Sequence, residues 1–95
     1  MSAKIVRCTT DGCAESATYK IAALWSDGAF SELKSYAYSC ADHLGESFRA
    51  AENRRKDYTP SLGEKLEEIG IYRYEQGKRD RLLQRLWGLE ENYRT

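Results

Sequence analysis

The clearest hydrophobic pattern in the chain is an alternation with period two in its N-terminal third. In residues 17–25 (ATYKIAALW), every second residue from Tyr19 to Trp25 falls on one face of an extended chain, so this segment predicts a β-strand. Residues 33–39 (LKSYAYS) are rich in the same residue types and predict a second strand. The segment between them, SDGAFSE, contains an Asp-Gly pair, and we expect a β-hairpin with a loop of about seven residues.

The period changes after these two strands. Leu44, Phe48 and Ala51 follow the spacing i, i+4, i+7, which is typical of one face of a helix. Residues 43–58 (HLGESFRAAENRRKDY) therefore predict an amphipathic helix with a basic, polar end. Asp42 is the expected N-cap, because its carboxylate can accept hydrogen bonds from the free N–H groups of the first turn.

The next segment also shows helical spacing. Residues 59–70 (TPSLGEKLEEIG) predict a second, short helix whose apolar face comprises Leu62, Leu66 and Ile69. Either Thr59 or the capping-box pair Ser61 and Glu64 would begin this helix. Residues 71–75 (IYRYE) are aromatic and β-branched and predict a third, short strand.

The last periodic segment covers residues 78–93, which predict a C-terminal amphipathic helix. Its apolar stripe consists of Leu82, Leu83, Leu86, Trp87, Leu89 and Tyr93. Such a stripe usually packs into a core, but it becomes a dimer or partner-binding face where another element already covers the sheet. The sequence leaves both alternatives open.

Length, composition and charge are those of one small folded unit. The chain has 95 residues, of which 41% are hydrophobic and 12% aromatic. Fifteen basic and fifteen acidic side chains cancel, so no net field attracts nucleic acid or a membrane. No apolar run approaches the roughly 18 residues of a membrane span, and MSAKIVRC lacks the apolar region of a secretory signal. Together with an odd number of cysteines, these features favour a reducing, cytoplasmic location and no membrane partner.

All three cysteines and the single histidine fall into two close pairs. Cys8 and Cys13 enclose a turn in which Gly12 lets the backbone reverse, and Cys40 and His43 have the i, i+3 spacing of one helical turn. Four such ligands predict one Zn²⁺ ion, and because they leave no position for water we expect a structural site and not a catalytic one. The alternative is that the first pair are small buried hydrophobes or a redox couple, and that the histidine is an exposed helix residue.

The order of these features resembles the treble-clef zinc fingers, in which a cysteine knuckle and a β-hairpin precede a helix whose first turn supplies the last two ligands. CTTDGC followed by ESATYKI and closed by YSCADHL is also similar to small bacterial zinc-ribbon modules. The resemblance covers about residues 6–48 and implies the ligand set Cys8, Cys13, Cys40 and His43. With it, the chain is expected to form a single α+β domain over residues 1–95. Residues 1–58 would be the zinc unit, and residues 59–95 would extend it by a helix, a strand and a helix.

Basic residues gather in two places, and they define the alternatives for function. They are Arg54, Arg55 and Lys56 in the first helix, and Arg73, Lys78, Arg79, Arg81 and Arg85 near the C-terminal end. With neighbouring tyrosines they could contact phosphates and bases, but a solvated helix face has the same composition. The chain has no second histidine to activate a nucleophile and no Gly-rich phosphate loop. We therefore expect a non-enzymatic module that binds a protein partner or its own copy, with nucleic-acid binding as the alternative.

Overall fold

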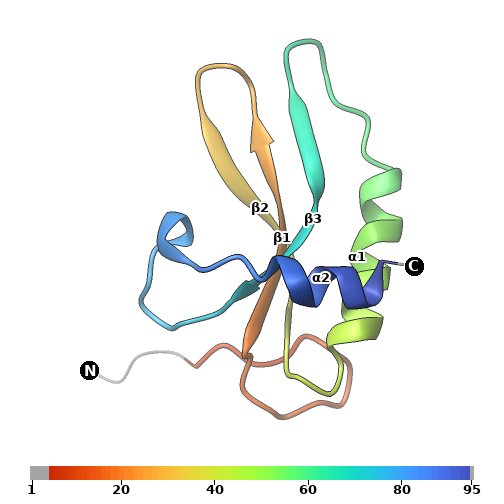
Figure 1. Cartoon of the computed structure of the whole chain (residues 1–95), viewed down its shortest axis with the longest axis vertical. Helices are drawn as coiled ribbons and strands as arrows, with labels where there is room; N and C mark the ends of the chain where they lie inside the picture. The colour runs from red at the N-terminus through yellow and green to blue at the C-terminus, as the bar shows by residue number, and fades with distance from the viewer. Residues whose placement is uncertain (1–4, 95) are drawn as a thin grey trace.

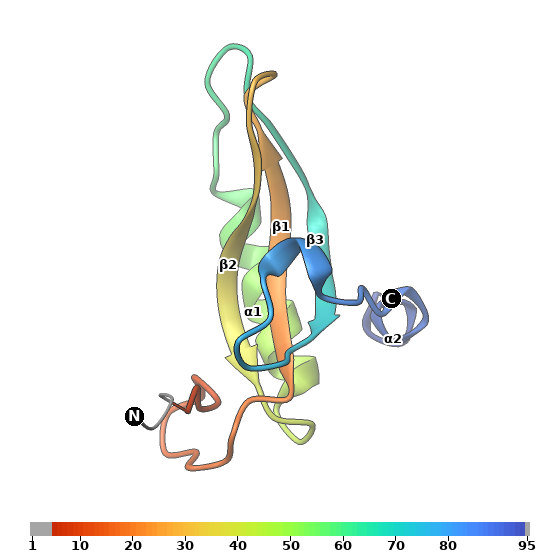
Figure 2. The same ribbon diagram turned by 90° about the vertical axis from the view of Figure 1, so that its left-hand side faces the viewer.

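The computed structural model describes residues 5–94, which form an antiparallel sheet covered on both faces. The elements are, in chain order, β1 (Tyr19–Ser26), β2 (Ser31–Ser39), α1 (Leu44–Lys56), β3 (Lys65–Arg73), the 3-10 turn η1 (Asp80–Leu82) and α2 (Trp87–Tyr93). The strand order is β2-β1-β3, so β1 is the central strand (Figure 1). Figure 2 shows α1 behind the sheet and η1 in front of it. The α+β class expected from the sequence is confirmed.

The main core lies between the sheet and α1. Alternate residues of β1 from Tyr19 to Trp25 face this core, as the sequence predicts. They pack against the apolar face of α1, which consists of Leu44, Phe48 and Ala51 and is at most 2% exposed. Burial of one such Leu or Phe side chain contributes about 1.5–3 kcal/mol, so this contact holds α1 on the sheet.

A smaller apolar cluster covers the opposite face of the sheet. Ala22 of β1, Tyr72 of β3 and Leu83 pack together there, and Leu33 of β2 lies partly buried beside them. Ala22 alternates with the core-facing residues of β1, so the central strand is buried on both faces.

The hairpin loop is shorter than predicted. Both strands extend further than the sequence suggested, and residues 27–30 alone connect them. The Asp27 carboxylate accepts hydrogen bonds from the N–H groups of Phe30 (2.7 Å) and Ala29 (2.9 Å), which lower its pKa and hold the turn together. Gly28 supplies the left-handed position of this turn, with φ of 95°.

The helix predicted over residues 59–70 is wrong, because the second half of that segment belongs to β3. Leu66 and Ile69 do lie on the same face, which packs into the main core, but a β-bulge and not a helix places them there. Trp25 of β1 pairs with Leu66 and Ala23 pairs with Ile69, so β3 takes three steps where β1 takes two. One extra residue in a strand thus reproduces the i, i+3 spacing of a helix.

A turn stands where that helix was expected to begin. The Ser61 N–H donates to the Glu64 carboxylate (2.7 Å) and the Glu64 N–H donates to the Ser61 carbonyl (2.9 Å). Gly63 lies between them with φ of 90°, so the chain reverses instead of continuing as a helix. Leu62 is left fully exposed at the tip of this turn.

The single helix predicted over residues 78–93 is also wrong. The structure has η1, an extended stretch and the short helix α2 in its place. In the extended stretch the Arg73 N–H donates to the Gln84 carbonyl (2.9 Å), and the Leu86 N–H donates to the Ile71 carbonyl (2.8 Å). The chain leaves the helical path because these bonds satisfy the outer edge of β3.

The apolar stripe predicted for that helix is divided over the molecule. Leu83 is buried on the η1 face of the sheet. Leu82 and Trp87 are 56% and 62% exposed. The other members of the stripe pack into the main core beside α1, and they are Leu86, Leu89 and Tyr93.

Candidate metal centre

The first half of the candidate site is a short backbone knuckle. The Cys8 N–H donates to the Glu15 carbonyl (2.9 Å), so the chain folds back on itself between these residues. The turn is closed by the Cys13 N–H, which donates to the Thr10 carbonyl (3.0 Å). Gly12 has φ of 81° in this turn, which is the reversal that the sequence predicted.

The knuckle is attached to the end of β2, where the second half of the site begins. The Thr9 N–H donates to the Tyr38 carbonyl (2.9 Å), and the Thr18 N–H donates to the Ser39 carbonyl (2.9 Å). These bonds bring the knuckle beside Cys40, which follows β2 directly. Figure 1 shows the N-terminal segment beneath the sheet, next to the start of α1.

His43 occupies the N-cap position of α1, which the sequence assigned to Asp42. The helix begins at Leu44, and no side chain caps its free N–H groups. The Asp42 cap is therefore wrong. The residue at the cap turns an imidazole toward the cysteines, and the burial of Leu44 holds the helix start in place.

The four candidate ligand atoms lie at separations that fit a tetrahedral metal ion. Zinc with Zn–S bonds of about 2.3 Å and Zn–N bonds of about 2.0 Å would separate two sulfurs by about 3.8 Å, and a sulfur from a nitrogen by about 3.5 Å. The Cys13 and Cys40 sulfurs are 3.8 Å apart, and His43 Nδ1 lies 3.7 Å from the Cys8 sulfur and 3.2 Å from the Cys40 sulfur. All four atoms lie within 4.8 Å of one another, and the cysteines are free thiols. The cluster could therefore hold a metal ion such as zinc, and the two predicted pairs do meet.

The surroundings of the site favour thiolate ligands unequally. Burial raises the pKa of Cys8, but hydrogen bonds from Thr10, from the Cys40 and Thr10 backbone and from His43 outweigh burial and lower this pKa to about 6. The backbone of Glu15 lowers the pKa of Cys13, but burial and the neighbouring sulfurs raise it above its ordinary value. Cys8 is thus more readily ionised for metal binding than Cys13, and a bound cation would offset the repulsion around Cys13.

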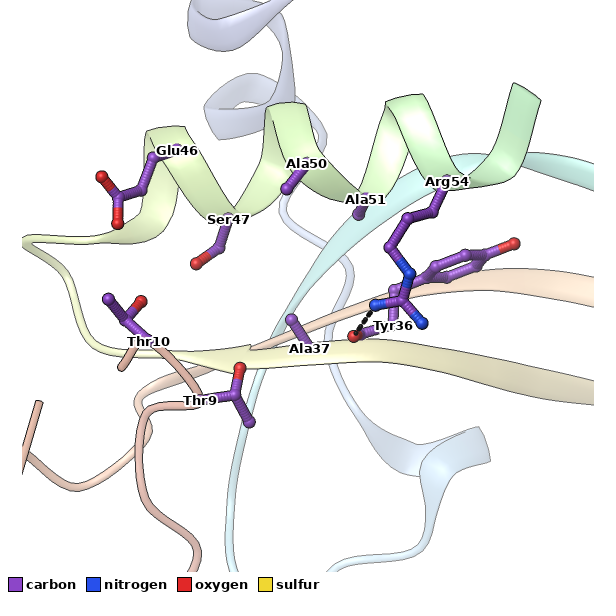
Figure 3. Close-up of a pocket in the computed structure, with 9 residues that line it drawn as sticks. All are labelled: Thr9, Thr10, Tyr36, Ala37, Glu46, Ser47, Ala50, Ala51 and Arg54. Atoms are coloured by element: carbon purple, nitrogen blue, oxygen red, sulfur yellow. Dashed lines mark hydrogen bonds between the residues drawn. The ribbon is translucent and has the colours of Figure 1, made fainter. Parts of the chain in front are cut away.

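Two of the basic candidates on α1 bind the sheet. Arg54 donates to the Tyr36 carbonyl (3.0 Å), at a bulge in β2, as Figure 3 shows. Arg55 donates to the carbonyls of Glu67 (2.6 Å) and Leu66 (2.8 Å), at the bulge in β3. Each guanidinium therefore satisfies carbonyls where a bulge interrupts the ladder.

The C-terminal basic candidates have several different environments. Lys78 pairs with Glu75 at 2.9 Å. Arg85 is 15% exposed and pairs with Glu90 at 2.8 Å. The exposed members of the whole set are Arg54, Lys56, Arg73, Lys78, Arg79 and Arg81.

The exposed basic residues do not gather on one side of the sheet. Arg79 precedes η1 and Arg81 lies within it, in front of the sheet in Figure 2, whereas Lys56 ends α1 behind it. The two basic concentrations seen in the sequence therefore occupy opposite faces of the molecule.

Glu90 is a buried carboxylate that the sequence analysis missed. It is 0% exposed, and its Oε2 accepts hydrogen bonds from the Ile71 N–H (2.9 Å) and from Arg85 Nε (2.8 Å). Its Oε1 faces Arg85 Nη2 (3.0 Å) and Arg94 Nη1 (3.1 Å), and the hydrogen bonds to Glu90 raise the pKa of Arg85. One signal was present in the sequence, because Glu90 follows Leu86 by four residues and so falls on the apolar face of α2.

Within residues 5–94, no helix is long and apolar enough to cross a membrane. No protein-family model matches the chain, and no curated protein or solved structure matches it.

Proposed function

We propose that this protein is a small zinc-stabilised interaction module of the treble-clef kind, and that its zinc ion has a structural role. The observation that carries the proposal is the tetrahedral spacing of Cys8, Cys13, Cys40 and His43. Four protein ligands complete the coordination sphere of zinc and leave no position for a reacting water, which supports a structural and non-enzymatic role.

The position of the site supports the same role. The ligands come from the knuckle, from the end of β2 and from the first residue before α1, and a zinc ion would join these three segments. The knuckle contributes only Cys8 to the buried residues, so apolar burial gives it little stability of its own. A metal cross-link would supply the missing free energy, because a site of this kind does not exist in the unfolded chain.

Elemental analysis and thermal unfolding test the structural role together. The purified protein should contain one zinc ion per chain, and removal of zinc by a chelator should lower Tm by more than about 20 °C, or abolish the cooperative transition, if several kcal/mol are lost. Addition of zinc should restore the transition. A metal-free protein that melts at the same temperature as the untreated protein would overturn the proposal.

Heparin chromatography tests the choice of a protein partner over nucleic acid. Arg54, Arg55 and Arg85 are hydrogen-bonded within the protein, and the exposed basic residues are split between two faces. The protein should therefore flow through a heparin column at about 0.1 M salt. Retention that falls steeply with salt would contradict the proposed class of partner.

A further inference from the structure

The two outer edges of the sheet differ in how their backbone groups are satisfied. Along β3, the extended stretch and the Glu90 carboxylate occupy the outward groups of Ile71 and Arg73. Along β2, the Thr9 backbone and Arg54 occupy the outward carbonyls of Tyr38 and Tyr36 at one end only. The rest of β2 forms the left-hand margin of the sheet in Figure 1 and faces the viewer in Figure 2.

The register of the hairpin identifies which backbone groups point outward from that free part. The Asp27 N–H donates to the Phe30 carbonyl (3.1 Å), so the backbone groups of Phe30 point toward β1. In an antiparallel ladder the backbone groups of successive residues point alternately toward the partner strand and away from it. Ser31, Leu33 and Ser35 therefore direct their N–H and C=O groups away from β1. Among residues 5–94, no hydrogen bond outside the β1 ladder is found for the backbone of these three residues.

The charges along this edge of β2 are complementary to those of a second copy of the same edge that runs antiparallel to it. They read Ser-Glu-Leu-Lys-Ser over residues 31–35. If two copies pair about a twofold axis at Leu33, Glu32 of each copy lies opposite Lys34 of the other, which gives two Glu–Lys pairs. Ser31 of each copy lies opposite Ser35 of the other. A parallel pairing in the same register would place Glu against Glu and Lys against Lys, which is unfavourable. The charge pattern thus suits a second copy of this chain and favours the antiparallel over the parallel direction.

We infer that residues 31–35 of β2 pair antiparallel with the same residues of a second copy of this chain, and that the two sheets join into one of six strands. This inference rests on the proposed function, because it names the partner of the proposed interaction module. The hydrogen-bonded pairs would be Leu33 with Leu33 and Ser31 with Ser35, since these residues carry the outward groups.

On the α1 face of the sheet, the packing leaves room for this pairing; on the other face η1 contacts β2, and Arg79 and Arg81 line one hollow with Ser31 and Leu33. The α1 helix contacts all three strands, so it lies over the middle of the sheet and not over its β2 edge. The two central strands of the joined sheet are three strand spacings apart, about 14 Å, which exceeds the 8–10 Å between packed helices. The two copies of α1 would therefore not collide.

The same register would also bury Phe30, an exposed aromatic side chain next to this edge. Phe30 is 73% exposed and is held in the turn by Asp27. In the paired arrangement Phe30 of one copy comes opposite Tyr36 of the other. A groove of about 480 Å³ lies there between β2 and α1, with Ala37 and Ala50 in its wall (Figure 3). Burial of Phe30 against this groove would add apolar area to the edge contact.

A charge-reversal series tests the pairing directly. Sedimentation equilibrium from about 1 µM to about 1 mM should show the wild-type chain approaching twice its mass of 10.9 kDa. Lys34→Glu alone and Glu32→Lys alone should each raise the dissociation constant at least about tenfold, because two attractive pairs become two repulsive ones. The double variant Glu32→Lys with Lys34→Glu should restore the dimer, and an equimolar mixture of the two single variants should form a heterodimer.

Controls separate a failure of the pairing from a failure of the fold. Lys65→Glu makes the same charge change on an exposed residue of β3 and should leave the dissociation constant unchanged. Every variant should keep one zinc ion and a cooperative unfolding transition at about 1 µM, where dimerisation adds little to Tm, so loss of dimerisation with zinc retained reports on the edge. A wild-type chain that remains at 10.9 kDa at about 1 mM would overturn the inference and leave the zinc proposal standing. A dimer that Lys34→Glu does not weaken would overturn it as well.

Discussion

The N-terminal and C-terminal segments of the described chain each contact the sheet through a polar cluster, half-buried in the first and buried in the second. At the N-terminal end, three thiols and an imidazole converge within 4.8 Å and join the knuckle to the start of α1. At the C-terminal end, the carboxylate of Glu90 joins α2 to the edge of β3 through Ile71, Arg85 and Arg94. The knuckle buries only Cys8, whereas the C-terminal segment also packs Leu86, Leu89 and Tyr93 against the main core, so the polar cluster is the main link only at the N-terminal end.

The difference between the clusters explains why only one was visible in the sequence. Cysteine and histidine are rare in this chain, and their close spacing predicts a metal ligand set. Glutamate and arginine are common and mostly solvated, so a buried pair has no distinctive sequence signal. The comparison predicts that removal of either centre costs far more than removal of exposed residues of the same type.

Loss of one candidate zinc ligand should have the largest effect. Cys13→Ser should lose zinc and unfold the knuckle, because structural zinc contributes about 10–16 kcal/mol in small fingers, more than most domains have in total. Hydrogen exchange should show the amides of Cys8 and Ala17 losing protection, and His43→Ala should behave in the same way. Ser16→Ala, an exposed change in the same knuckle, is the control and should retain one zinc ion per chain. A folded, zinc-replete Cys13→Ser protein would require another ligand.

Removal of the buried carboxylate should rank second. Glu90→Ala leaves Arg85 with no charge partner at 15% exposure, and breaking a buried ion pair costs about 3–5 kcal/mol. Urea unfolding should show this loss. The adjacent Glu91→Ala is exposed and should change the free energy of unfolding by less than about 0.5 kcal/mol. Equal effects from the two variants would show that Glu90 is not the centre of this cluster.

Substitution of Gly70, which lies beside Arg85, should show how tightly the Glu90 cluster is packed. A Cβ at Gly70 would come within 2.7 Å of Arg85 Nε, so Gly70→Ala should cost about 1–3 kcal/mol by displacing the guanidinium from Glu90. In a Glu90→Ala background Arg85 is free to move, and the same change should cost less. Gly88→Ala is the control, because nothing lies near its Cβ, and it should stabilise α2 by up to about 1 kcal/mol. An identical cost of Gly70→Ala in both backgrounds would contradict the coupling.

The arginines should have the smallest effects, and they should differ from one another. Arg55→Ala removes hydrogen bonds to two carbonyls at the β3 bulge and should cost about 1 kcal/mol. Arg79→Ala should change the free energy of unfolding by less than about 0.5 kcal/mol, since Arg79 is exposed at the residue before η1. Thermal or urea unfolding of the two variants side by side distinguishes these cases, and a larger loss for Arg79→Ala would reverse the assignment.

The sequence predicted elements well where local pattern and tertiary packing agree. The face of β1 from Tyr19 to Trp25 and the apolar side of α1 were both correct, because the same spacing that identifies them also buries them. The ligand pairs were predicted by residue type and spacing alone, and Gly12 by its need for a left-handed turn.

The predictions from the sequence were wrong where a feature of the tertiary structure produces the same residue spacing as a helix. Leu66 and Ile69 have helical spacing because a bulge adds a residue to β3, and nothing local to that segment distinguishes the two cases. The apolar stripe of residues 78–93 predicts one helix. The middle of this segment is instead extended, because it forms backbone hydrogen bonds with the outer edge of β3. In both cases the deciding hydrogen bonds come from strands that are distant in the sequence.

The amino-acid sequence by itself determined the candidate Cys3His ligand set, the hairpin and the helix that follows it, because each depends on residue type at short spacing. Only the tertiary structure decided that β3 would be a strand, that the C-terminal segment would divide across two faces, and that Glu90 would be buried. These outcomes depend on satisfying backbone groups at a sheet edge and charges in the interior, and the partners that satisfy them are brought together only by folding.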